Sequence, residues 1–99
     1  MNIKDILLRI GYARNKARLS ARELSLKMGM SSQYVAKIES GNITLSVEKL
    51  LEILKICQFS EEKFFSENPY EYDSQQELFN LINNLSNEKK RHLIEFLKK

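Results

Sequence analysis

The chain has little cysteine, proline or glycine. Its single cysteine, Cys57, cannot close an internal disulfide, and it excludes a zinc site built from several cysteines. Three glycines and one proline leave few helix breakers, and abundant Leu, Ile, Lys and Glu favour helix over strand. No apolar run approaches the ~18 residues of a membrane span, and residues 6–8 are too short for the apolar part of a secretion signal. We therefore expect a small, mostly helical intracellular protein with no membrane partner.

The net charge of +3 is unevenly distributed along the 99 residues, which suffice for one domain with a small appendage. Residues 1–41 carry a net charge of +5, residues 42–85 carry −5, and residues 86–99 carry +3. A basic N-terminal part beside an acidic middle is typical of a protein with one face directed at a polyanion. A solvated surface of mixed charge explains the same distribution equally well, so charge alone does not decide.

Apolar residues recur at helical spacing along the chain, and no stretch alternates in the way that a strand does. Five helices are expected within the first 66 residues. Serines at N-cap positions mark the starts of the second to fifth helices at Ser20, Ser31, Ser46 and Ser60. Gly29 and Gly41 supply the left-handed conformation that ends the second and third helices.

The C-terminal third has a separate organisation. Pro69 prevents the preceding helix from continuing, so residues 67–73 are expected to be a linker. Beyond the linker, Ser74 and Glu77 have the spacing of a capping box, and Ser86 is placed to cap a last helix. Residues 74–99 are therefore expected to form a short hairpin of two amphipathic helices.

This hairpin carries more apolar surface than two small helices can bury alone, and we expect it to be a dimerisation element. The candidate interface residues are Leu78, Phe79, Leu81, Ile82, Leu93, Phe96 and Leu97. The alternative is that these side chains pack back on the first five helices.

Two short helices separated by a glycine turn, at residues 21–40, form the most informative pattern. The side chains that must point inward to fix the angle between the helices are Leu24, Met28, Met30, Val35 and Ile38. Ser25 is small where the two helices approach most closely. Such a pair places its second helix in the DNA major groove while the first crosses the phosphate backbone.

The segment 19–41, LSARELSLKMGMSSQYVAKIESG, resembles the phage repressor and Cro-like family, also called the XRE family. The similarity extends over residues 3–66. It implies an all-α fold in which residues 1–66 form a five-helix, lambda-repressor-like DNA-binding domain, followed here by the helical hairpin. It also implies a transcriptional regulator, a repressor, that binds a palindromic operator in double-stranded DNA as a homodimer. Arg18 departs from the family, which usually has glycine there.

The same resemblance assigns the DNA-contacting positions. Base contacts fall on Ser32, Gln33 and Lys37, along the exposed face of the third helix. Gln can bond an adenine edge in bidentate fashion, and Lys can donate to guanine. Phosphate contacts fall on residues whose hydroxyl and amide groups suit that role: Ser20, Ser31, Tyr34, Ser40, Asn42 and Thr44. The alternative is an ordinary polar helix face.

Arg14 and Glu39 correspond to an internal ion pair in several members of that family. We expect them to tie the first helix to the end of the third. Removing one partner of a buried pair costs ~3–5 kcal/mol, and less where the site is partly wet.

Nothing in the sequence predicts catalysis, a metal or a cofactor. His92 has no second histidine or cysteine cluster beside it, and no serine has a basic partner that would make it a nucleophile. The competing class of function is a protein-interaction adaptor or antitoxin-like module whose C-terminal hairpin grips a protein partner. A regulator of this kind is expected in the cytoplasm, associated with the nucleoid.

Overall fold

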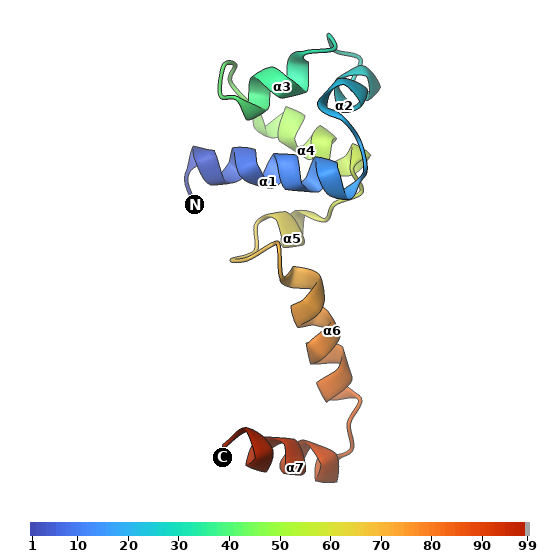
Figure 1. The fold of residues 1–99 in the computed structure, drawn as a ribbon. Coiled ribbons are helices and arrows are strands. Elements are labelled where there is room, and N and C mark those ends of the chain that lie inside the picture. Colours follow the sequence, from blue (N-terminus) through green and yellow to red (C-terminus); the bar gives the residue numbers. More distant parts are fainter. Residues whose placement is uncertain (99) are drawn as a thin grey trace. The chain divides into compact units, whose positions relative to one another are not determined.

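The computed structural model describes residues 1–98, which form seven helices and no strand (Figure 1). The helices are α1 (Ile3–Lys16), α2 (Ala21–Lys27), α3 (Tyr34–Glu39), α4 (Val47–Ile56), α5 (Glu61–Phe64), α6 (Tyr72–Asn83) and α7 (Asn87–Leu97). The predicted all-α fold is confirmed. The chain divides into two compact units, Met1–Ser66 and Glu67–Lys99, and Lys99 of the predicted hairpin lies outside the described residues.

The first unit contains the hydrophobic core, to which each of α1 to α5 contributes an apolar face. The buried apolar residues are Ile10, Ala13, Leu24, Met28, Val35, Ile38, Leu50, Ile53, Leu54, Cys57, Phe59 and Phe64. Phe59 and Phe64 meet edge to face, with ring centroids 6.3 Å apart. Burial raises the pKa of the Cys57 thiol, which stays a neutral, small apolar group at the end of α4.

Four helices of this unit end in the same way, with one residue in the left-handed conformation. The positive φ angles belong to Arg18 (59°), Gly29 (70°), Gly41 (78°) and Gln58 (53°). In each case the next amide donates back to the carbonyl five residues earlier; Met30 N, for example, lies 3.0 Å from Ser25 O. This Schellman geometry supplies hydrogen-bond donors to carbonyls that have none at the end of a regular helix. Arg18 therefore occupies a position where glycine is favoured, in line with the glycine usual in the similar family.

Arg9 fastens α1 to the end of α5, a contact that the sequence pattern does not indicate. Its side chain is buried, and Nη1 donates to the carbonyl oxygens of Phe64 at 2.7 Å and Ser66 at 2.5 Å. The guanidinium is held at the C-terminal end of a helix, where a positive charge is favourable. One of the eight basic residues of segment 1–41 is therefore structural and adds little to the surface.

The second unit begins its first helix earlier than the sequence predicts. The N-cap of α6 is Glu71, with no side-chain capping bond, so the capping box predicted for Ser74 and Glu77 is wrong. A turn built on Asn68 starts the helix instead, because its side-chain oxygen accepts from Tyr70 N at 3.1 Å and its carbonyl from Glu71 N at 3.3 Å. Two residues of the predicted linker, 72 and 73, are therefore helical.

No side chain of α6 or α7 is buried. Leu78, Phe79, Leu81, Phe96 and Leu97 are between 58% and 71% exposed, while Ile82 and Leu93 are half-buried. The two helices follow one another as predicted, with Ser86 accepting from Lys89 N at 3.2 Å to cap α7. They do not form a packed hairpin, since most of the apolar side chains that would make its core are exposed to solvent.

Candidate nucleic-acid interface

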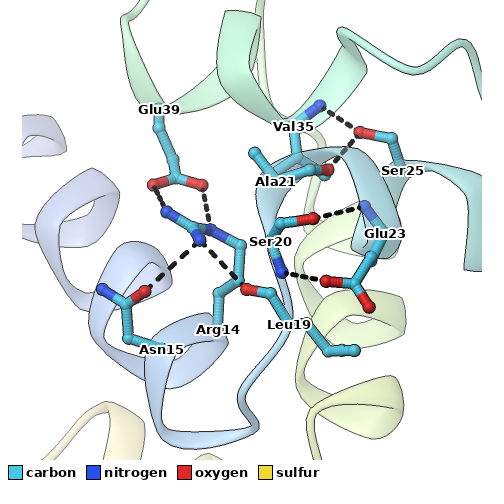
Figure 2. Close-up of polar contacts among 9 residues, drawn as sticks. All are labelled: Arg14, Asn15, Leu19, Ser20, Ala21, Glu23, Ser25, Val35 and Glu39. Atoms are coloured by element: carbon cyan, nitrogen blue, oxygen red, sulfur yellow. Dashed lines mark hydrogen bonds and ion pairs between the residues drawn. The ribbon is translucent and has the colours of Figure 1, made fainter.

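Helices α2 and α3 are locked together by the fully buried Ser25. Its hydroxyl donates to Ala21 O at 2.7 Å and accepts from Val35 N at 2.9 Å (Figure 2). The Val35 amide lies in the first turn of α3, where a helix leaves its N–H groups without internal partners. A side chain of α2 therefore caps α3 and fixes how α3 lies across it. The sequence indicated the need for a small residue here but not the role of its hydroxyl.

The start of α3 differs from the prediction. The helix begins at Tyr34, its N-cap is Gln33 without a side-chain capping bond, and the prediction that Ser31 is the N-cap is wrong. Ser31 O accepts from Tyr34 N at 3.1 Å, so residues 31–34 form a turn. Because Ser25 supplies the cap from α2, the chain needs none from Ser31. Ser32 and Gln33 lie in this turn and not, as predicted, on the face of the helix itself.

Gln33 and Lys37 are nonetheless on one exposed side of this element. They are four residues apart, one helical turn, and Lys37 N donates to Gln33 O at 3.0 Å. Val35 and Ile38 are fully buried on the opposite side. Ser32 is half-buried. The structure thus exposes two long polar side chains, Gln33 and Lys37, on the same side of α3, whose other side is buried in the core.

The residues assigned to phosphate contacts differ in their exposure and local contacts. Ser31, Ser40, Asn42 and Thr44 are exposed, and Tyr34 is half-buried at the start of α3. The Ser40 hydroxyl donates to Lys37 O at 3.1 Å, at the end of α3.

Ser20 is the exposed N-cap of α2 and shares a capping box with Glu23. Glu23 N donates to Ser20 Oγ and Ser20 N donates to Glu23 Oε1, both at 3.0 Å (Figure 2). The backbone hydrogen bond from Ser20 lowers the pKa of Glu23, so this carboxylate stays charged. A phosphate that accepts from the Ser20 hydroxyl would therefore meet a negative charge nearby.

Arg14 and Glu39 form a two-pronged ion pair between α1 and α3. Arg14 Nε lies 2.8 Å from Glu39 Oε2, and Nη2 lies 3.0 Å from Oε1 (Figure 2). The hydrogen bond to Glu39 raises the pKa of Arg14. The side chains are 17% and 20% exposed, so removing one partner is expected to cost less than for a fully buried pair.

Gly11 makes room for this ion pair. A Cβ at this position would lie 2.9 Å from Glu39 Oε1, closer than real contacts allow. Glycine inside a helix costs about 1 kcal/mol relative to alanine. In α1 that cost is offset because the carboxylate of Glu39 can approach the helix closely enough to meet Arg14.

Six basic residues of segment 1–41 remain exposed after Arg9 and Arg14 are assigned to internal contacts. They are Lys4, Lys16, Arg18, Arg22, Lys27 and Lys37. The charge of Glu39, which would repel phosphate near α3, is balanced by Arg14. The first unit therefore keeps a basic surface, although a smaller one than the sequence count indicates.

Among residues 1–98, no helix is both long and apolar enough to cross a membrane. Within the same residues, no group of three His, Cys, Asp or Glu side chains could hold a metal ion.

Residues 10–64 match the family HTH_3, described as helix-turn-helix. The match contains α2 to α5 and the second half of α1, so it includes the Ser25 lock, the turn at residues 31–34 and the Arg14–Glu39 pair. No characterised protein and no solved structure gives a significant match to the chain. The finer resemblance to phage repressors and Cro stays a prediction. The chain belongs to the helix-turn-helix family HTH_3, a family of DNA-binding regulators.

Proposed function

We propose that the protein is a sequence-specific transcriptional repressor of the phage repressor and Cro-like kind. Gln33 and Lys37, with Ser32 beside them, contact base edges in the major groove of double-stranded DNA. The observation that carries this proposal is the exposure of Gln33 and Lys37 on one side of an element whose other side is fully buried. An element held in this way can present its polar groups to bases without moving.

The chemistry of the exposed side chains suits DNA. The amide of Gln33 matches the donor and acceptor of an adenine edge, and the ammonium of Lys37 can donate to guanine. The phosphate contacts are made by Ser20, Ser31, Tyr34, Ser40, Asn42 and Thr44, and the exposed basic residues add attraction at longer range.

The regulator binds as a homodimer. Two copies place their α3 elements in successive major-groove faces, about 34–36 Å apart, so the operator is a palindrome. The dimer is held by the C-terminal helices, whose apolar side chains are open in the single chain. The protein acts in the cytoplasm, at the nucleoid, where its target lies.

Selection of bound duplexes from a random pool tests this function. We expect one enriched sequence with two-fold symmetry and half-sites one helical turn apart. For six or more phosphate contacts, affinity for that duplex should fall by about 10³ or more between 50 and 200 mM salt. A pool without enrichment, in which random duplexes compete equally well, would contradict the proposal.

A second candidate is a protein-interaction adaptor or antitoxin-like module. The open apolar side chains of α6 and α7 favour it, since such a face also suits a protein partner. The salt series separates the two functions, because binding through an apolar face does not weaken steeply with salt.

A further inference from the structure

Helices α6 and α7 present the same apolar pattern to solvent. Leucines, isoleucine and phenylalanine occupy positions i, i+1, i+3 and i+4 in both, as Leu78, Phe79, Leu81 and Ile82 in α6 and as Leu93, Ile94, Phe96 and Leu97 in α7. Six of these eight side chains are more than half exposed. The two helices therefore carry apolar faces of matching width and spacing.

The charges beside the two faces are opposite. Residues 65–88 contain no Lys or Arg, and α6 is flanked by acids that include Glu71 and Glu77. α7 contains the basic run Lys89, Lys90 and Arg91 against two acids. Glu71 is seven residues before Leu78, and Lys90 is seven before Leu97, so these charges lie in line with the apolar faces.

The basic run stands at the wrong end of its helix for local stability. Lys89 lies in the first turn of α7, where the partial positive charge of a helix N-terminus disfavours cations, and Lys90 and Arg91 follow directly. Lys89 and Lys90 are nevertheless next to the apolar face, since each is three or four residues before Leu93. An acidic surface on a partner accounts for cations at this place.

We propose that the partner is a second copy of this chain, and that α6 of each protomer packs against α7 of the other. A two-fold axis makes this contact twice, so each acidic helix meets a basic one. Pairing like helices would instead put acids against acids and bases against bases. This inference rests on the homodimer proposed above and specifies which surfaces make it.

The apolar area is sufficient for such a dimer. The six exposed side chains become twelve in two copies, and at roughly 100 Å² each they bury roughly 1,200 Å², the lower limit of stable interfaces. Pairing α6 with α7 of the same chain is not what the structure contains, because neither helix has a buried side chain.

Charge reversal in the full chain tests the arrangement. One variant carries Glu71→Lys and Glu77→Lys, and the other carries Lys89→Glu and Lys90→Glu. All four residues lie outside the predicted DNA-contacting set, and the second variant places acids where the α7 helix start favours them. Glu48→Lys with Lys55→Glu, exposed on α4, is the matched control. Sedimentation measures self-association, and circular dichroism verifies that helix content is kept.

For each charge-reversed variant alone, the dissociation constant of the homodimer should rise roughly tenfold or more. In such a homodimer both contacts between α6 and α7 join helices of like charge. An equimolar mixture of the two should recover wild-type association, as a heterodimer visible by native mass spectrometry. The α4 control should associate as wild type does.

Three results would overturn the inference. Unchanged association in both single variants indicates like-with-like pairing or an uncharged interface. If the mixture does not recover association but a chain carrying all four changes does, α6 pairs with α7 within one chain. If the Lys89→Glu, Lys90→Glu variant keeps its self-association but binds a single half-site duplex more weakly than wild type, these lysines contact DNA. In each of these cases the duplex selection can still succeed, so failure of this inference is distinguishable from failure of the proposed function.

Discussion

At the scale of single residues, the hydroxyl of Ser25 joins α2 and α3, the two helices of the helix-turn-helix. Replacing Ser25 by alanine leaves the buried Val35 amide without its acceptor. An unsatisfied buried donor costs about 1–3 kcal/mol. We expect Ser25→Ala to lower the free energy of unfolding by that amount in urea denaturation, and to speed hydrogen exchange at the Val35 amide.

Ser74→Ala is the matched control, because Ser74 is exposed in α6 and should change stability by less than about 0.5 kcal/mol. If Ser25→Ala is as stable as this control and Val35 exchange is unchanged, the hydroxyl does not cap α3.

Ser25 and Gly11 also mark the limit of what the sequence could reveal. The sequence pattern required a small residue at position 25, and it contained no reason for a glycine at position 11 inside a helix. The reasons for both residues lie far along the chain, in the Val35 amide and in the Glu39 carboxylate. Helical spacing reports which residues share a face, but it does not report which distant polar group a side chain or a gap will meet.

At the scale of elements, the helix ends offer a paired test of backbone strain. Gly29→Ala should lower the free energy of unfolding by about 1 kcal/mol, since φ is 70° and an added Cβ has no neighbour within 4 Å to stabilise it. Arg18→Gly should raise it by up to about 1 kcal/mol, because Arg18 holds the same conformation with φ of 59°. Thermal unfolding of each variant and of wild type measures these changes. If Arg18→Gly were only as stable as wild type, strain at Arg18 would be excluded.

Helix starts were predictable where the cap is local. Ser20, Ser46, Ser60 and Ser86 all accept from the amide three residues on, as their sequence context predicts. The prediction failed at Ser31, where the cap comes from Ser25 on another helix, and at Ser74, where the turn at Asn68 starts the helix first. Capping boxes are local patterns, so a cap supplied by tertiary contact leaves no signal beside the helix.

At the scale of the whole molecule, charge has two separate uses. Arg9 and Arg14 hold helices of the first unit together through carbonyls and a carboxylate. Six other basic residues of the first 41 remain exposed and can attract a polyanion. The basic surplus is a count from the sequence, but the sequence could not divide it between these uses, because the division depends on which residues α1 meets in the folded chain.

Base recognition by Gln33 is central to the proposed function, and one binding measurement tests it directly. The selected duplex is compared with the same duplex changed at the single base pair assigned to Gln33, using the full chain, Gln33→Ala, and the exposed Gln76→Ala on α6 as control. Gln33→Ala should lose about 1–3 kcal/mol of preference between the two duplexes, a factor of roughly 5–150, while Gln76→Ala keeps it. Full preference and affinity in Gln33→Ala would contradict the account.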